Sequence, residues 1–443
     1  MLNIDFEEYM NQGKILLGQE KYAEAVESFK KAEEIDNMNI NLYIYKGICF
    51  ANLDDTDNAK AEFLKALKIN KKEGVIYFHL GNIEILQGNK AKGIEYYNNA
   101  IAYGFDDAQV YFSLGLMNEE EGNVDIALRN YSKAILKDPN RPDIRIRKAR
   151  LFIASKMYSE ALQCLDELIL SNPDVFEGYH LKNLILIEMG KYEEAEKVLA
   201  TAMGLFPKDP AFAIDRASLE TYKKNYQGAL DRFAEIEKNY ELEIENYHTI
   251  SMEKARIYSY LENMQDTIKQ LGLARDYALK LEPPVLDLEA IYLLMNCYLS
   301  IEDYDNVIAM AQEIKKASGE EYYQLAAYYY EPLALKKKNK INEANKMFDE
   351  AVSHYRKISL GAPNNLDSYA FRIMSLRELG KLDKALELSD FLVKVNENMA
   401  EAHTLRAIVL DDLGRVDEAK AERSKAAQIG SSVVDVNELI ERR

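Results

Sequence analysis

The stretch AQVYFSLGLMNEEEGNVDIALRNYSKAILKDPNR, residues 108–141, decides the fold of this chain. Its apolar and small residues recur at steps of three and four on both sides of Gly122, which is the spacing of one face of an α-helix. Glycine often ends a helix and proline cannot continue one, so Gly122 and Pro139 mark where the two helices are expected to stop. The stretch therefore predicts a helical hairpin with its turn near Gly122.

The same hairpin pattern returns through the first half of the chain at a constant interval, the one that separates Ala25 from Ala59. A fixed period of this length predicts hairpins stacked into an elongated solenoid, because one hairpin cannot bury its apolar face alone. Two columns of small residues are expected to let the helices approach closely, and a bulky column fills the gap beside them. The three columns are Ala25, Ala59, Gly93, Ala127, Ala161, Ala195 and Ala229; Gly13, Gly47, Gly81, Gly115 and Ala149; and Phe29, Phe63, Tyr97, Tyr131, Leu165, Leu199 and Phe233.

Beyond residue 243 the first small column continues with longer steps. An insertion of about four residues adds close to one helical turn of about 3.6 residues, so the buried face of the helix keeps its direction. We therefore expect longer helices over 244–365. Only the last step, from Ala385 to Ala419, returns to the interval of the first half. The column runs through Thr267, Val307, Ala344, Ala385 and Ala419.

These residues resemble the tetratricopeptide repeat family, in which an aromatic residue opens the first helix, small residues lie at the helix crossings and a proline closes the unit. The resemblance implies an all-α fold, an α–α superhelix of stacked antiparallel helical hairpins. It covers nearly the whole chain as twelve units: seven regular ones over 6–243, three longer ones over 244–365 and two over 366–433, with a C-terminal cap or tail over 434–443. Residues 108–141 match the family pattern at Tyr111, Leu114, Gly115, Gly122, Ala127, Tyr131, Ala134 and Pro139.

Charge and composition exclude several functional classes. The net charge of −18 opposes binding to nucleic acid, because the phosphates require a basic protein surface. The sequence shows no secretory signal and no apolar run long enough to span a membrane, so we expect a cytoplasmic protein without membrane insertion. The three cysteines, Cys49, Cys164 and Cys297, are widely spaced without a CxxC pair and are expected to be buried reduced thiols.

Sequence signals of catalysis, metal binding and cofactor binding are missing. Neither a P-loop nor a strand followed by GxGxxG occurs, and an all-helical chain offers no sheet to carry them. The sequence therefore predicts a non-catalytic protein with no cofactor and no metal. The five histidines stand singly, without HxxxH or HExxH spacing: His79, His180, His248, His354 and His403.

The resemblance also implies which side chains face a partner. In the family, the first helix of each unit lines the concave groove, so the positions just after the aromatic column face that groove. Here these positions are unusually apolar, and we expect them to bind a protein segment. The alternative is that they pack between neighbouring first helices and contact no partner. The candidate contact residues of this part are Tyr45, Ile48, Phe78, Asn82, Phe112, Leu116, Arg147, Arg150 and His180.

The densest basic cluster of this acidic chain lies at 141–150. Arg147 and Arg150 are expected to project into the groove, where a planar guanidinium group can bind a carboxylate through two hydrogen bonds. Together with the apolar side chains around them, they indicate an apolar or amphipathic partner segment with an acidic flank. The alternative is that these arginines pair with Asp143 and Glu119 on a solvated face.

Tyr329 and Tyr330 extend the candidate groove into the irregular units. They precede Pro332, which lacks an amide hydrogen and is expected to kink or restart the helix. Tyrosines beside such a bend can contact a partner, although an aromatic stripe also fits packing at an irregular interface between units.

The sequence as a whole predicts a protein–protein interaction scaffold or adaptor that captures a peptide or helix of another protein in its concave groove. Two other functions remain open. The longer units at 244–365 look like those of peptide-sensing bacterial regulators of the same superfamily, in which the ligand would change the pitch of the superhelix. The chain could also be a docking subunit of an enzyme complex.

Overall fold

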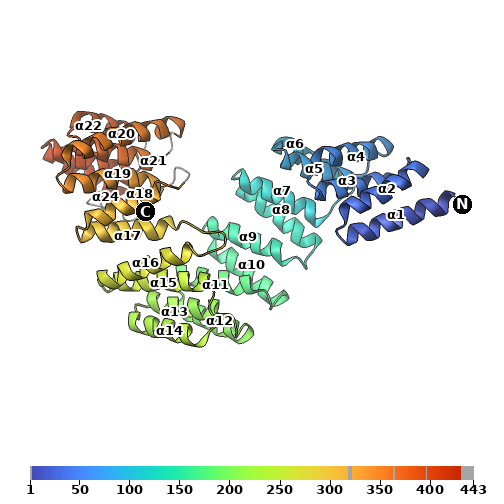
Figure 1. The fold of residues 1–443 in the computed structure, drawn as a ribbon, viewed down its shortest axis with the longest axis horizontal. Helices are drawn as coiled ribbons and strands as arrows, with labels where there is room; N and C mark the ends of the chain where they lie inside the picture. Colours follow the sequence, from blue (N-terminus) through green and yellow to red (C-terminus); the bar gives the residue numbers. More distant parts are fainter. Residues whose placement is uncertain (1, 318–321, 363–364, 396, 431–443) are drawn as a thin grey trace. The chain divides into compact units, whose positions relative to one another are not determined.

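The chain folds into helices joined by short turns, as predicted (Figure 1). The computed structural model describes residues 2–317, 322–362, 365–395 and 397–430. All regular secondary structure in these ranges is helical, and consecutive helices pair as hairpins. The chain divides into two compact units, Met1–Pro207 and Lys208–Arg443, which we call unit 1 and unit 2. The tail expected at 434–443 lies outside the described residues.

Unit 1 contains six hairpins, in which odd-numbered helices come first and even-numbered helices second. Each hairpin packs on the next through its second helix, and several first helices also touch directly, α1 with α3, α3 with α5 and α9 with α11. The first helices thus form one wall of this unit. The helices are α1 Leu2–Gly18, α2 Tyr22–Ile35, α3 Ile40–Asn52, α4 Thr56–Ile69, α5 Gly74–Leu86, α6 Lys90–Ala102, α7 Ala108–Glu120, α8 Val124–Lys137, α9 Pro142–Ala154, α10 Tyr158–Ser171, α11 Phe176–Glu188 and α12 Tyr192–Leu205.

Unit 2 contains six hairpins of more variable length. Its longest helices, α15, α19 and α20, have 17, 16 and 21 residues, in line with the longer steps of the sequence. In contrast, α17 and α18 have only 13 and 11 residues, because extra residues there lie in connections such as 279–287. The helix α19 continues through Pro332, so the restart expected at that proline does not occur. The helices are α13 Ala211–Tyr222, α14 Tyr226–Asn239, α15 Ile244–Tyr260, α16 Met264–Ala278, α17 Leu288–Ser300, α18 Tyr304–Ile314, α19 Tyr322–Lys337, α20 Ile341–Gly361, α21 Leu366–Glu378, α22 Leu382–Val395, α23 Ala400–Asp412 and α24 Val416–Ile429.

The sequence columns form the core, as predicted. Ala127 has no exposed surface, and the same holds for its counterparts Ala25, Ala59, Ala161, Ala195 and Ala229. The glycine column lies against the aromatic column: a Cβ atom placed on Gly47 would lie 2.6 Å from the Phe63 ring, and one on Gly81 would lie 2.7 Å from the Tyr97 ring. Such distances are well inside van der Waals contact, so these crossings require glycine.

Each of the twelve hairpin turns contains one residue in the left-handed backbone region, with φ between 55° and 81°. The following residue donates its amide hydrogen to the carbonyl oxygen five residues back, as from Asn123 to Asn118 at 2.8 Å, which closes a Schellman motif. The glycines predicted to lie between paired helices occupy this position. The left-handed residues are Gly88, Gly122, Gly190, Gly380 and Gly414, and the non-glycines Glu20, Asp54, Lys156, Lys224, Glu262, Glu302 and Asn339.

Candidate functional site

The candidate contact residues all lie on first helices but differ in their access to solvent. Arg150 is exposed, whereas three aromatic residues are buried. Access therefore divides the set into residues that a partner can reach and residues that it cannot. The buried ones are Phe78, Tyr329 and Tyr330, and the half-buried ones are Tyr45, Ile48, Asn82, Phe112, Leu116, Arg147 and His180.

Phe78 on α5 is a core residue, with 4% of its surface exposed. Its ring centroid lies 5.9 Å from that of Tyr97 and 5.3 Å from that of Phe105. These distances are typical of packed aromatic pairs. The ring packs between Tyr97 of its own hairpin and Phe105, which follows that hairpin. It is therefore not part of the contact surface proposed below.

Tyr329 and Tyr330 on α19 are also core residues, each 2% exposed. The Tyr329 ring centroid lies 5.9 Å from that of Phe348, and the Tyr330 ring centroid lies 6.4 Å from that of Tyr292. Burial raises the pKa of Tyr329 well above its ordinary value. The structure thus has the arrangement of the alternative reading, in which these tyrosines pack an irregular interface, and they too are left out of the contact surface.

Tyr45 and Asn82 reach the wall of unit 1 but are engaged by neighbouring side chains. The ring of Tyr45 stacks on Phe29 at a centroid distance of 5.8 Å, and the ammonium group of Lys14 lies 5.5 Å from its centroid. The hydroxyl of Tyr97 donates a hydrogen bond of 2.7 Å to the Asn82 side-chain oxygen. Ile48, one turn after Tyr45, is half-buried beside the core of the first three hairpins.

A partly exposed strip crosses three consecutive first helices of unit 1, α7, α9 and α11. On each helix two residues three or four positions apart share one face. Leu184 on α11, which has the same repeat position as Leu116 and Arg150, is 46% exposed. The guanidinium carbon of Arg141 lies 5.6 Å from the ring centroid of Phe112. We call the following residues the inner strip: Phe112, Leu116, Arg147, Arg150, His180 and Leu184.

The two arginines of the inner strip connect successive hairpins. Arg147 donates from Nε and Nη2 to the Glu119 carboxylate, at 3.0 and 2.9 Å, and this pairing raises the pKa of Arg147. Arg150 pairs with Glu177 of α11. The pairing with Glu119 is the one considered in the alternative, whereas Asp143 pairs with Arg141. The Arg147 and Arg150 side chains remain 43% and 57% exposed, and each guanidinium group has donors left for a further carboxylate.

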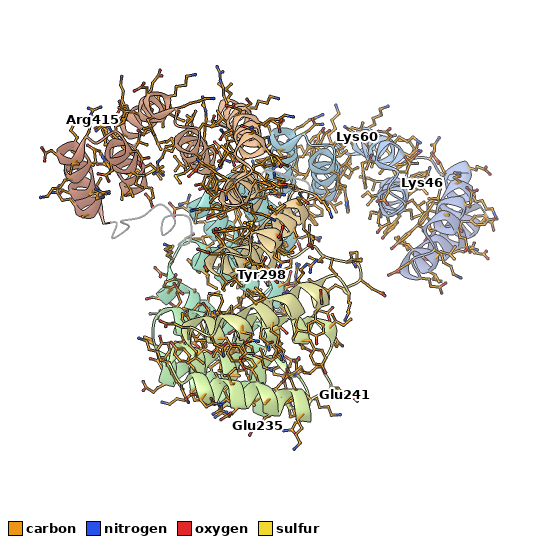
Figure 2. The ribbon with its side chains drawn as sticks, turned by 60° about the vertical axis from the view of Figure 1, so that its left-hand side comes forward. Lys46, Lys60, Glu235, Glu241, Tyr298 and Arg415 are labelled. Atoms are coloured by element: carbon orange, nitrogen blue, oxygen red, sulfur yellow. The ribbon has the colours of Figure 1, made fainter. Side chains whose placement is uncertain are left out.

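Buried charges elsewhere in unit 1 are structural. Lys46, labelled in Figure 2, has a side chain only 4% exposed, between the carboxylates of Glu33 and Glu62. Burial raises the pKa of Glu84, but hydrogen bonds from Lys60 and Lys92 outweigh that effect and lower it to about 2. Because Lys46 and Glu84 each meet opposite charges from other helices, these two groups join neighbouring helices.

Unit 2 contains a cavity of about 1010 Å³ that the sequence analysis did not predict. It is lined by α15, α16, α17, the connection 279–287 and Tyr323 of α19. None of the candidate contact residues lines it. Two features of the sequence mark the place, the long step from Thr267 to Val307 and the pair Pro283 and Pro284, which together lengthen this connection.

The described part of the chain holds no helix that is both long and apolar enough to cross a membrane. In the same residues no group of three or more His, Cys, Asp or Glu side chains is arranged to hold a metal ion. Cys49 and Cys164 are buried free thiols, as expected, but Cys297 is only half-buried because it borders the cavity. Burial raises the pKa of Cys49 and of Cys297 to about 11, so both thiols are protonated at neutral pH.

Comparison with known proteins gives the family of these hairpins. Tetratricopeptide repeat profiles match hairpins in both units, and together they cover more than half of the chain. The matched residues are 9–37, 40–73, 75–103, 119–185, 176–209 and 372–431.

Individual relatives are distant. The mouse (Mus musculus) BBSome complex member BBS4 is 22% identical over 298 residues, which are 59% of this chain and 57% of the relative. The TPR repeat-containing protein MJ1428 of Methanocaldococcus jannaschii is 25% identical over 213 residues, 46% of this chain and 37% of the relative. This chain thus spans about half or less of these relatives. A crystal structure of a tetratricopeptide repeat protein from Parabacteroides merdae is 17% identical, with a TM-score of 0.42, and covers 59% of this chain and 98% of that one. From its columns, its hairpins and the matching profiles, the chain belongs to the tetratricopeptide repeat family.

Proposed function

We propose that this protein is a non-catalytic scaffold that binds a segment of a partner protein on the inner strip of unit 1. The proposal is carried by one observation: apolar and cationic side chains on α7, α9 and α11 are held side by side and remain partly exposed. The mouse relative is named as a member of a complex, which agrees with a role in protein assembly.

The chemistry of the inner strip defines the partner. Leu184 and the half-buried Phe112 and Leu116 offer apolar surface, which favours an apolar or amphipathic segment. Arg147 and Arg150 lie in the middle of the strip and favour a carboxylate beside that apolar part. Because the net charge of the chain is −18, such a basic patch makes this face more favourable for an acidic partner than the rest of the surface.

Rigidity explains how a strip of modest contacts can bind. The packed cores between α7 and α9 and between α9 and α11 hold the strip in place before a partner arrives, and the pairs Arg147 with Glu119 and Arg150 with Glu177 orient its guanidinium groups. Binding then requires little ordering of the scaffold, and most of the contact energy contributes to affinity.

The test is capture of partners from an extract of the protein's own cells by the purified full chain, quantified by mass spectrometry. We expect Leu184→Asp to reduce capture about tenfold, because it places a carboxylate in the apolar part of the strip and beside an acidic segment. The matched control is Leu170→Asp on α10, a leucine that is 86% exposed on a second helix. It is expected to leave capture unchanged.

Two results would contradict the proposal. One is a set of captured proteins that is the same for Leu184→Asp and for the unaltered chain. The other is loss of capture with Leu170→Asp alone, which would place the interaction on the second helices instead.

A further inference from the structure

The cavity of unit 2 has the size of a ligand site. Its volume of about 1010 Å³ matches the upper end of the range of about 300–1,000 Å³ that is usual for pockets that bury a whole ligand. The first helices α15 and α17 both line it, and the connection 279–287 forms a further wall.

That connection is fixed at both ends, so the cavity has a defined wall. The amide of Val285 donates to the Ala278 carbonyl oxygen at 3.0 Å. Asp287 accepts a hydrogen bond of 3.0 Å from the amide of Ala290 and thereby caps α17. Its other carboxylate oxygen lies 2.7 Å from Nε2 of His248 on α15. The contact between Asp287 and His248 connects the 279–287 wall to α15, which lies on the opposite side of the cavity.

Most of the lining is apolar and comes from every wall. Val285 and Leu293 are 46% and 36% exposed, so the apolar surface is open to a ligand and not only part of the core. A partner that places bulky apolar side chains there removes this surface from water, which is the main favourable term in such binding. The apolar lining residues include Met252, Leu271, Leu281, Val285, Leu286 and Leu293.

The charged lining is acidic. Three carboxylates, Glu253, Asp287 and Glu289, face one guanidinium group, that of Arg256. Arg256 already pairs with Glu253, and Asp287 is held by His248. Glu289 lies exposed in the first turn of α17 and forms no ion pair within the described residues. The Glu289 carboxylate is therefore available to a ligand, and it favours a cationic group.

We propose that this cavity binds a peptide segment in which bulky apolar side chains stand next to lysine or arginine. The inference goes beyond the function proposed above, because it assigns a second site in unit 2 whose preferred flank has the opposite charge to that of the inner strip. One chain would then hold two kinds of segment.

The test uses the purified full chain at physiological salt and short fluorescent peptides with two central leucines, flanked either by lysines or by glutamates. We expect the lysine-flanked peptide to bind about tenfold more tightly than the glutamate-flanked one, and to lose binding when serines replace its leucines. The variant Glu289→Lys is expected to remove the preference, because it turns an attractive rim charge into a repulsive one.

A matched variant separates this site from general attraction to an acidic protein. Glu235→Lys makes the same charge change on α14, at an exposed residue that does not line the cavity (Figure 2). It should bind the lysine-flanked peptide as the unaltered chain does. Equal affinity for the two peptides, or the same loss in both variants, overturns the proposal. The variant Leu184→Asp should leave this binding intact, so failure here and failure of the inner strip are distinguishable.

Discussion

The six regular hairpins of unit 1 and the lengthened hairpins around α15–α20 of unit 2 use space differently. In unit 1 the repeat interval is constant, so each glycine of the column lies against the aromatic ring of its own hairpin, as Gly47 does with Phe63. These contacts leave no room for a Cβ atom. In unit 2 the interval is longer between Thr267 and Val307, and a cavity of about 1010 Å³ opens beside the longer connection.

In these two regions a constant repeat interval goes with close crossings inside each hairpin, and a lengthened connection goes with a cavity lined by two first helices. Where the repeat interval is constant, the same small and bulky residues meet in each hairpin and pack closely. Where a connection is lengthened, its residues can bridge two first helices without filling the gap between them. Asp287, which caps α17 and contacts His248 on α15, is the residue that forms this bridge.

The largest effect is expected where close packing is broken in unit 1. A Cβ atom on Gly115 would lie 2.6 Å from Cδ1 of Tyr131, so Gly115→Ala should lower the free energy of unfolding by about 2 kcal/mol through overpacking. Gly272→Ala on α16 of unit 2 meets nothing within 4 Å and should raise it by up to about 1 kcal/mol through helix propensity. Hydrogen exchange of amides in each unit measures both changes. Equal effects at the two glycines would erase the contrast.

A smaller effect is expected from His79 of unit 1 as the pH falls. His79 stacks on Phe63 at 5.0 Å, and burial lowers its pKa from 6.5 to about 4. Because the unfolded chain binds this proton first, stability should fall as the pH drops below about 6.5 and level off near 4, with a loss of about 1 kcal/mol between pH 7 and 5.5. Urea unfolding at these pH values measures the loss. In His79→Phe this part of the pH dependence should vanish, and its persistence would show that another group causes it.

The smallest effect is expected at the rim of the inner strip. Arg150 is 57% exposed and pairs with Glu177, and exposed ion pairs contribute little, so Arg150→Ala should change the free energy of unfolding by less than about 0.5 kcal/mol. Thermal unfolding monitored by circular dichroism is the measurement. A loss of several times this size would mean that the arginine holds α9 to α11, and that its role in binding could not be separated from folding.

Most of the fold could be predicted from the sequence, because the same residue types return at the same interval. Ala127 and its counterparts are buried, and Gly88, Gly122 and Gly190 turn the chain where expected. The lengths of α17 and α18 could not be predicted. A longer interval between column residues indicates only that residues are added. Whether they extend a helix or a connection depends on local contacts such as the cap made by Asp287.

The candidate site was less predictable for a physical reason. The positions that follow the aromatic column face either a groove or the next first helix, and only the neighbouring side chains decide between them. Phe78 is covered by Tyr97 and Phe105, whereas Arg150 at a related position stays open. The cavity of unit 2 depends on the meeting of His248 and Asp287, which no spacing rule predicts.

The left-handed residues at the hairpin turns have a consequence for how this array can change. Seven of the twelve are not glycine, and a side chain in that conformation brings Cβ close to a carbonyl oxygen, at a cost of about 1 kcal/mol or more for a residue such as Lys156. Glycine at these seven places would relieve that crowding without altering a helix face. Stability and binding thus depend on different residues of the chain, so substitutions can change either one while the other is kept.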